Sequence, residues 1–214
     1  MFTEFCLKFM DELFTIGHST HSVEGFLELL RMHRINAIAD VRSSPYSRHT
    51  PQFNREPLQA FLKDQGIAYV LLGKELGARG EDPSSYLNGQ VQFNLLAQTG
   101  LFKKGLDRLR KGASFHRITL LCAEKDPIRC HRMILVCRHL RADLMIQHIL
   151  EDGELEQNDQ AERRLMRELR IPESDLFASE QELIDRAYDL QGKRIAYVEK
   201  SGENGEPSFN GVNS

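Results

Sequence analysis

Short apolar runs alternate with amphipathic stretches along the first two thirds of the chain. Five apolar runs have the length of β-strands, at residues 12–17, 35–41, 68–72, 118–122 and 144–149. The stretches between the first four runs carry apolar residues three and four positions apart, which is typical of helices. This alternation predicts an α/β fold: an open, mostly parallel sheet of about five strands with helices on both faces.

Local signals predict where several helices begin and end. Ser22 precedes the first amphipathic stretch and is a good N-cap, while Gly66 follows the helix expected at 57–65 and suits its C-terminal end. Gly100 interrupts the helical region at about 91–111. The Asp126-Pro127 pair predicts a further helix that begins directly after the fourth strand.

The composition changes after the fifth strand. Charged helical segments at 160–169 and 180–188 flank Pro172, and the last fourteen residues are rich in Gly, Asn and Ser. We therefore expect an α/β core domain at 12–153, a helical annex at 154–200 and a disordered tail at 201–214. The annex helices are the candidate surface for a protein partner.

Composition and charge exclude several classes of protein. The 214 residues are 41% hydrophobic, which suffices for one sizeable core, and the net charge is −3. A sequence-tolerant nucleic-acid coat would be strongly basic, so any nucleic-acid contact needs a local patch. The four cysteines, Cys6, Cys122, Cys130 and Cys137, show no disulfide spacing, and no secretory signal or membrane-length apolar run is present. We expect a cytoplasmic protein with no membrane contact.

Ionisable residues occur at the end of every expected strand. In an open parallel sheet the ligand site lies beyond the carboxyl ends of the strands, so these residues should face one cleft. The residues in question are His18 and Ser19, then Asp40, Arg42 and Ser43, then Lys74 and Glu75, then Cys122, Glu124 and Lys125, and finally His148.

The segment 120–132 carries the strongest chemical signal. Two thiols, Cys122 and Cys130, accompany Glu124 at the start of the expected helix. His131 and Arg132 follow in its first turn, where cations oppose the helix dipole unless an anion compensates them. The same positions also have structural interpretations, because Cys130 is spaced for the buried face of the helix and His148 in an apolar strand is typical of a core histidine.

These residues predict an enzyme, a hydrolase with carboxylate acid–base chemistry, that acts on a phosphate-bearing nucleotide or nucleic acid. Arg42 and Arg132 would bind phosphate, and Glu75 or Glu124 would act as acid or base. The candidate catalytic residues are Glu75, Glu124, Cys122, Cys130 and His131. The candidate substrate-binding residues are His18, Ser19, Asp40, Arg42, Ser43, Tyr46, Lys74, Lys125 and Arg132.

Three alternatives remain open. A phosphatase or sulfurtransferase with a catalytic Cys122 would need an anion-binding loop, but the first arginine, Arg129, is one position too distant and the loop has no glycine. Cys122, Cys130 and His131 could bind a metal with His18 or His148, yet no paired ligand spacing supports this, so we predict no metal ligands. The chain could also be a non-catalytic nucleic-acid or protein adaptor that binds through the loop 42–54 and the annex.

Five motifs in order resemble a known family. They are Thr15–Ser19, Asp40–Pro45, Lys74–Gly77, Leu121–Lys125 with Cys130–Arg132, and His148–Ile149 before Asp152–Gly153. Together they resemble the prokaryotic family catalogued as domain of unknown function 488, over about Leu13 to Gly153. The resemblance implies one cleft and a connection with nucleic-acid processing, but no particular reaction. Neither the residues nor the resemblance identifies a cofactor.

Overall fold

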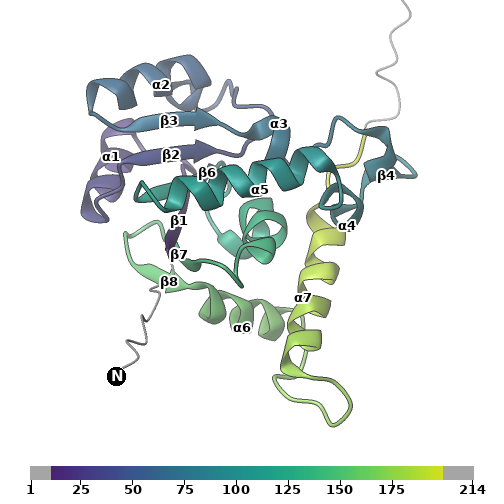
Figure 1. The fold of residues 1–214 in the computed structure, drawn as a ribbon. Coiled ribbons are helices and arrows are strands. Elements are labelled where there is room, and N and C mark those ends of the chain that lie inside the picture. Colours follow the sequence, from purple (N-terminus) through teal and green to yellow (C-terminus); the bar gives the residue numbers. More distant parts are fainter. Residues whose placement is uncertain (1–10, 200–214) are drawn as a thin grey trace, which may run out of the picture.

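A six-stranded sheet forms the centre of the computed structural model, which describes residues 11–199 (Figure 1). Its strand order is β3-β2-β6-β1-β7-β8. The parallel strands are β1 (Glu12–Gly17), β2 (Ala37–Asp40), β3 (Ala68–Leu71), β6 (Ile118–Cys122) and β7 (Met145–Ile149). A short strand that the sequence pattern did not predict, β8 (Leu155–Gln157), is antiparallel to β7. The mostly parallel α/β fold is confirmed.

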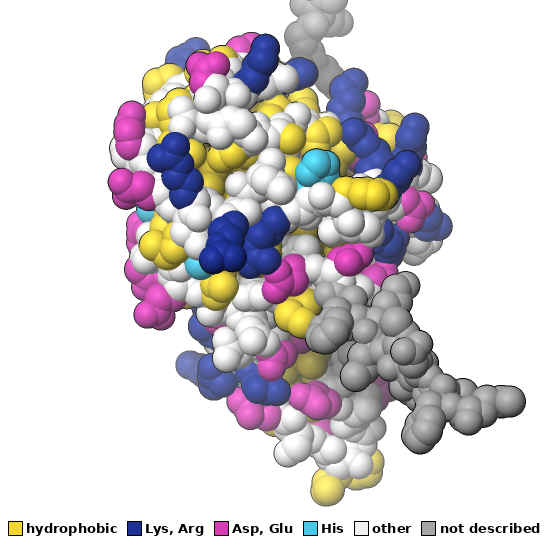
Figure 2. All heavy atoms as spheres, turned by 60° about the vertical axis from the view of Figure 1, so that its left-hand side comes forward, with side chains coloured by type: hydrophobic (Ala, Val, Ile, Leu, Met, Phe, Trp, Pro, Cys, Tyr) yellow, Lys and Arg dark blue, Asp and Glu magenta, His cyan; other side chains and the backbone are white. Residues whose placement is uncertain are grey.

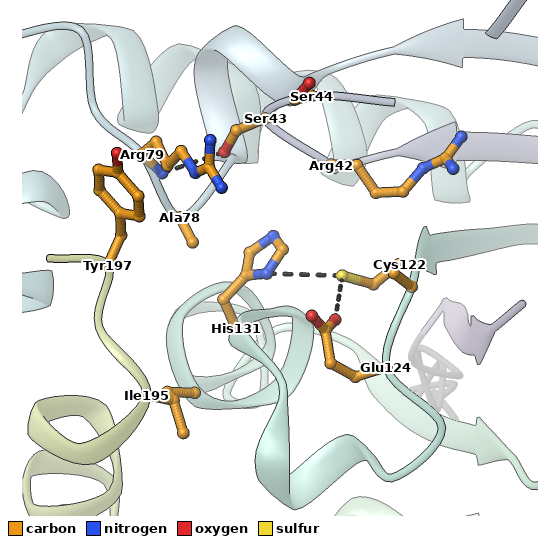
Figure 3. Close-up of a pocket in the computed structure, with 11 residues that line it drawn as sticks. Arg42, Ser43, Ser44, Ala78, Arg79, Cys122, Glu124, His131, Ile195 and Tyr197 are labelled. Carbon is orange, nitrogen blue, oxygen red and sulfur yellow. Dashed lines mark hydrogen bonds between the residues drawn. The ribbon is translucent and has the colours of Figure 1, made fainter. Parts of the chain in front are cut away.

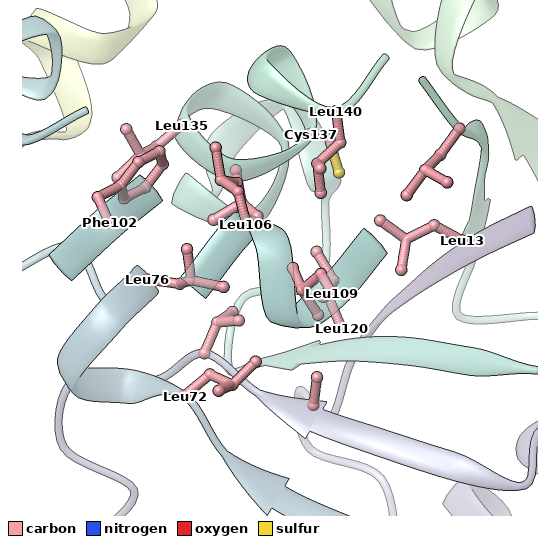
Figure 4. Packing of buried hydrophobic residues seen from close by; sticks show 14 of the residues in the cluster. Leu13, Leu72, Leu76, Phe102, Leu106, Leu109, Leu120, Leu135, Cys137 and Leu140 are labelled. Carbon is pink, nitrogen blue, oxygen red and sulfur yellow. The ribbon is translucent and has the colours of Figure 1, made fainter. Parts of the chain in front are cut away.

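Helices cover both faces of this sheet because the side chains of each strand alternate between two cores. Phe14 and Ile38 pack with α1 (Val23–Met32) and α2 (Arg55–Asp64) on one face. Leu13 and Leu120 pack on the other face with α5 (Gly100–Ala113) and with Leu135 from the segment after β6 (Figure 4). The remaining elements are η1 (Pro51–Phe53), α3 (Gly73–Leu76), η2 (Pro83–Ser85), β4 (Tyr86–Leu87), β5 (Gln90–Val91) and α4 (Phe93–Leu96).

The predicted capping residues of α1 and α2 have the expected geometry. The Ser22 hydroxyl accepts a hydrogen bond from the Gly25 backbone N–H at 3.1 Å. Gly66, two residues beyond the end of α2, has a φ of 73°, which glycine adopts without strain. Short-range side-chain chemistry therefore fixes these boundaries.

The helix expected from Asp126 is the main difference in secondary structure. Asp126 does cap a turn, but the turn is a single 3-10 turn, η3 (Pro127–Arg129), and the chain is extended at Cys130, with φ −130° and ψ 141°. A π-helical segment, η4 (Arg132–Val136), and a 3-10 turn, η5 (Cys137–His139), follow. Cys130 consequently lies between η3 and η4 and not on a helix. It is buried nevertheless, as its spacing to Ile134 and Cys137 predicted.

The annex packs against this irregular segment. Its helices are α6 (Asn158–Glu168) and α7 (Glu180–Ile195), and Leu165 and Tyr188 share a buried cluster with Ile128 and Met133. The division into core and annex stays a prediction, but residues after 153 complete both the sheet and this cluster. The predicted disordered tail lies outside the described residues.

The surface carries no large field of one sign on the side that lies to the left in Figure 1. There, basic and acidic side chains are interspersed with apolar and neutral ones (Figure 2), as the net charge of −3 leads one to expect. Within residues 11–199, no helix combines the length and the apolar character that crossing a membrane requires.

A buried chain of hydrogen bonds joins the sheet to the annex. Thr15 Oγ1 accepts from Arg132 Nε at 3.3 Å and lies 2.8 Å from His148 Nδ1, while His148 Nε2 lies 3.2 Å from Asn158 Oδ1. Asn158 Oδ1 only accepts, so His148 donates from Nε2, and in the neutral ring Nδ1 then accepts from the Thr15 hydroxyl. The chain continues from Asn158 Nδ2 to Glu162 at 2.8 Å. His148 is therefore the satisfied core histidine that its apolar strand predicted.

We predict that His148 makes the fold sensitive to acid. Burial, aided by the charge of Arg132, lowers the pKa of His148 from 6.5 to about 3. The unfolded chain protonates this histidine near pH 6.5 and the folded chain does not, so its contribution is complete above pH 6.5 and is lost as the pH falls toward 3. The free energy of unfolding should fall by up to about 1.4 kcal/mol per pH unit from this group alone. Urea unfolding between pH 7 and pH 5 measures the effect.

The variant His148→Gln keeps an amide donor for Asn158 but does not titrate, so its stability should depend less steeply on pH. His116→Gln, which removes an exposed histidine at the end of the loop before β6, is the matched control. Identical pH dependence in the wild type and in His148→Gln would contradict the prediction.

Candidate functional site

A pocket of about 260 Å³ opens at the carboxyl ends of β2 and β6. Its position follows the rule for open parallel sheets. The pocket is lined by Arg42, Ser43, Ser44, Ala78, Arg79, Cys122, Ala123, Glu124, His131, Ile195 and Tyr197 (Figure 3). Loops at the carboxyl edge of the sheet, the end of α7 and the segment after α7 therefore contribute to one pocket.

Two thiols, a carboxylate and an imidazole meet at the floor of this pocket. One oxygen of Glu124 accepts from Cys122 Sγ at 2.8 Å and from Cys130 Sγ at 3.0 Å. His131 Nδ1 lies 3.5 Å from Cys122 Sγ and 3.9 Å from Cys130 Sγ. We call these four residues the floor cluster. Cys122, Glu124 and His131 line the pocket, and Cys130 lies behind them with 1% of its surface exposed.

The orientation of the His131 ring is fixed from outside the cluster. Its Nε2 lies 3.0 Å from the Val41 carbonyl oxygen, which can only accept, so Nε2 carries a hydrogen and donates. Nδ1 therefore faces the two sulfurs. Burial alone would lower the pKa of His131, but the Cys130 sulfur and the nearby Glu124 carboxylate outweigh it and raise that pKa.

The two thiols have opposite tendencies to ionise. Burial raises the pKa of Cys122 well above its ordinary value. Burial opposes ionisation of Cys130 as well, but the hydrogen bond from Cys122 and the positive charge of Arg132 together lower the pKa of Cys130 well below its ordinary value. The Glu124 carboxylate has a raised pKa, first because of burial and then because of the charge on Cys130.

Arg132 holds the floor cluster in place from beneath. Its guanidinium is fully buried and donates to the carbonyl oxygens of Glu124 at 2.5 Å and Lys125 at 2.9 Å. Its backbone N–H donates to Cys130 Sγ at 3.5 Å. Among residues 11–199 it has no ion-pair partner. The Arg132 guanidinium therefore serves the fold and is not directed into the pocket.

Arg42 forms part of a second rigid chain along the wall. Its guanidinium donates to both carboxylate oxygens of the buried Asp40, at 2.9 and 2.6 Å, and lies 3.2 Å from His18 Nε2. Burial, and then the charge of Arg42, lower the pKa of His18 from 6.5 to about 4, so this ring stays neutral. Figure 3 shows the Arg42 guanidinium turned away from Cys122.

Arg79 is the cation that lies over the pocket. Its side chain is exposed, and its guanidinium carbon lies 4.3 Å from the ring centroid of Tyr197. Its backbone N–H donates to the Ser43 hydroxyl at 3.0 Å. No carboxylate among the described residues pairs with it. Tyr197 is fixed in turn, since its carbonyl oxygen accepts from the Val91 N–H at 3.0 Å.

The structure brings six of the fourteen candidate residues together at the pocket. Arg42, Ser43, Cys122, Glu124 and His131 line it, and Cys130 completes the floor cluster. The others lie behind it or elsewhere. Asp40, His18 and Arg132 support it through hydrogen bonds, and the Ser19 N–H donates to the Ala123 carbonyl oxygen at 3.0 Å.

Four candidates use their polar groups outside the pocket. The exposed Lys74 pairs with Glu81, and Glu75 pairs with Arg108 of α5. Lys125 pairs with Glu151, and the exposed Tyr46 donates to Glu56 at 2.8 Å. None of these four lines the pocket.

The candidate residues from the sequence did not include six of the lining residues, namely Ser44, Ala78, Arg79, Ala123, Ile195 and Tyr197. Arg79 had a signal, because it belongs to a glycine-rich, charged loop at 73–85 of the kind that often carries function. Tyr197 had none. It reaches the pocket only because the chain after α7 returns to β5, through an isolated bridge between Gln90 and Val198.

Comparison with known proteins gives one finding. A family model described as Domain of unknown function DUF488 matches residues 22–138. The matched range contains Arg42, Arg79 and the whole floor cluster, while Tyr197 lies beyond it. No curated protein and no solved structure matches the sequence.

We predict that Gly17→Ala disturbs the floor cluster. Gly17 ends β1, and a Cβ there would overlap the backbone carbonyl oxygen of Glu124, the same oxygen that Arg132 holds. Two backbones that approach this closely cannot both stay in place, so the variant should be destabilised by roughly 1–3 kcal/mol. Urea unfolding measures the change.

The control is Gly100→Ala at the first position of α5, where an added Cβ meets no atom within 4 Å. That variant should be as stable as the wild type, or more stable by about 0.4–1 kcal/mol. If both variants unfolded at the wild-type urea concentration, the close approach at Gly17 would not constrain the site.

Proposed function

The chain belongs to the DUF488 family, whose description names no reaction, and we propose from the pocket itself that the protein is an enzyme acting on a phosphate-bearing substrate, a nucleotide or nucleic acid. The observation that carries this proposal is the convergence of a free cation and a reactive floor in one pocket. Arg79 lies over the opening, and the floor cluster lies beneath it. Buried thiols and an imidazole also occur in hydrophobic cores, but here they meet a carboxylate at the floor of an open pocket, which favours a site that carries chemistry.

Arg79, rather than Arg132, is the group that meets the anion. Its guanidinium is exposed and has no acidic partner in the described chain, so a phosphate can form two hydrogen bonds with it without displacing another group. Ser43 also lines the pocket, and its hydroxyl accepts from the Arg79 backbone N–H. At about 260 Å³ the pocket is at the lower end of the range of about 300–1,000 Å³ for ligand sites, so it suits the phosphate-bearing part of a substrate.

Glu124 is the acid–base candidate that the geometry favours over Glu75. Its carboxylate lies on the pocket floor in contact with both thiols, whereas the Glu75 carboxylate is paired with Arg108 outside the pocket. A carboxyl group beside a bound phosphoester can transfer a proton to or from the reacting oxygen. The reaction class that follows is hydrolysis.

A catalytic thiol is supported less well. The thiol that reaches the pocket, that of Cys122, is the one whose pKa is raised by burial, and the thiol that ionises readily, that of Cys130, is behind it. Nucleophilic attack needs an accessible thiolate. Alkylation of Cys122 at neutral pH should therefore be no faster than that of an ordinary thiol.

The test is a screen of turnover and binding with mononucleotides, dinucleotides and single-stranded oligonucleotides. Glu124→Gln should lower kcat by about 100-fold or more while substrate still binds, as is typical when an acid–base group is removed. Arg79→Ala should weaken binding at least about tenfold, since the loss of even one charge-assisted hydrogen bond has that effect. Turnover is followed by chromatography of the nucleotide products, and binding by calorimetry.

Matched controls separate these effects from the loss of a charge as such. Glu75→Gln removes a carboxylate outside the pocket, and Lys63→Ala removes an exposed cation of α2. Both should behave as the wild type does. If no substitution in the floor cluster changed turnover, but changes in the loop 42–54 abolished nucleic-acid binding, the protein would be an adaptor and the proposal would fail.

A further inference from the structure

We propose that the floor cluster is a binding site for one divalent transition-metal ion of the zinc type, with Cys122, Cys130 and His131 as fixed ligands and Glu124 in the fourth position, which faces the pocket. The inference concerns the same pocket and rests on the proposed function for its biological role. Metal binding itself is independent of any substrate and is measured without one.

The four donor atoms are close enough to share one ion. All of them lie within 4.8 Å of one another. In a tetrahedral site with metal–sulfur bonds of about 2.3 Å and metal–nitrogen bonds of about 2.0 Å, neighbouring donors are about 3.5–3.8 Å apart. The distances of 3.5 and 3.9 Å from His131 Nδ1 to the two sulfurs agree with this spacing.

The Glu124 oxygen lies closer to the sulfurs, at 2.8 and 3.0 Å, than the spacing of about 3.5 Å between donors that share a metal. When both thiols lose their protons to a metal, these hydrogen bonds disappear and the carboxylate takes a longer spacing. Glu124 is exposed as a residue, so its side chain is free to rotate to this longer spacing while Arg132 holds its backbone.

The surroundings of His131 and Cys130 are those of metal ligands. A ligating histidine usually donates its other ring N–H to a carbonyl or carboxylate group, which fixes the tautomer and directs the free nitrogen at the metal. His131 donates from Nε2 to the Val41 carbonyl oxygen at 3.0 Å and directs Nδ1 at the sulfurs. Cys130 Sγ accepts the Arg132 backbone N–H, an interaction that favours a thiolate.

The charges of the occupied site agree with its surroundings. No carboxylate within residues 11–199 forms an ion pair with the fully buried Arg132, so the negative charge that compensates it comes from the floor cluster beside it. Two thiolates and one carboxylate carry three negative charges, and a divalent ion carries two positive ones. The occupied site would therefore have a net charge of −1, which the guanidinium of Arg132 balances.

The ligand types select the class of metal. Two sulfurs, one imidazole and one carboxylate suit zinc, cobalt or ferrous iron, and do not suit magnesium or calcium. Because three ligands are buried and Glu124 is exposed as a residue, Glu124 is the ligand that a substrate atom can replace. A site with three fixed ligands and one exchangeable position is typical of catalytic rather than structural zinc.

The test uses the full-length protein, reduced and treated with a chelator, and then titrated with Co²⁺. One equivalent should bind and give the sulfur-to-cobalt charge-transfer absorption and the intense visible bands of a tetrahedral site, and Zn²⁺ should displace it. X-ray absorption of the zinc-loaded wild type should show two sulfur and two nitrogen or oxygen neighbours, so this result does not depend on any variant.

Variants identify the ligands. Cys130→Ser and His131→Gln should lower the Co²⁺ affinity by about 100-fold or more, since even residues that only support a ligand contribute 10- to 100-fold. Glu124→Gln should bind more weakly than wild type but keep both sulfur neighbours. Cys137→Ser is the matched control, because it removes a buried thiol of the hydrophobic core that is not a donor. Circular dichroism verifies that each variant is folded.

The outcomes separate this inference from the proposed function. Absence of stoichiometric Co²⁺ binding to the reduced wild type would overturn the inference, as would unchanged affinity in a folded Cys130→Ser variant. A disulfide between Cys122 and Cys130 in a protein that takes up no metal when reduced would identify a redox pair instead. Turnover without metal binding would leave the proposed function standing, and metal binding without turnover of any phosphate-bearing substrate would leave only the site.

Discussion

The rest of the site depends on the hydrogen bonds that the buried guanidinium of Arg132 donates. It joins three parts of the chain that are distant in sequence: β1 through Thr15, the loop after β6 through two carbonyl oxygens, and its own segment η4. Each hydrogen bond replaces one that the guanidinium would make with water, which makes burial of the charge tolerable. As a result, the loop that carries Glu124 has a fixed position relative to the sheet. The same charge, after the hydrogen bond from Cys122, contributes to the lowered pKa of Cys130.

The sequence predicted the strands and helix caps well because these depend on neighbouring residues. Apolar runs of strand length and the capping groups of Ser22 and Gly66 act over a few positions, and the structure confirms them. The break at Cys130 was not predictable in the same way. Asp126 and Pro127 are a good helix start, but tertiary packing of η3 under the annex stops the helix after a single turn.

The pocket was predictable in its position but only partly in its composition. The loops that follow parallel strands meet at one edge of the sheet. This rule correctly predicted that Arg42, Cys122 and Glu124 lie at the same edge. It could not say which side chains turn inward, since Lys74 and Glu75 occupy an equivalent position and pair elsewhere. Tyr197 depends on a chain return from α7 to β5, which no local pattern encodes.

The π-helical segment η4 has a consequence for the alignment of related sequences. An α-helix advances by about 100° per residue, and a wide turn accommodates one residue more than a regular turn of the same length. A relative with one residue fewer between Cys130 and Cys137 could form a regular helix and keep the fold. The residues on the two sides of the missing position would then be rotated by about 100° relative to each other, so Arg132 and the core residue Leu135 could not both keep their present directions. A single-residue gap at this place would therefore divide the family into members that retain the thiol-rich floor and members that share only the scaffold.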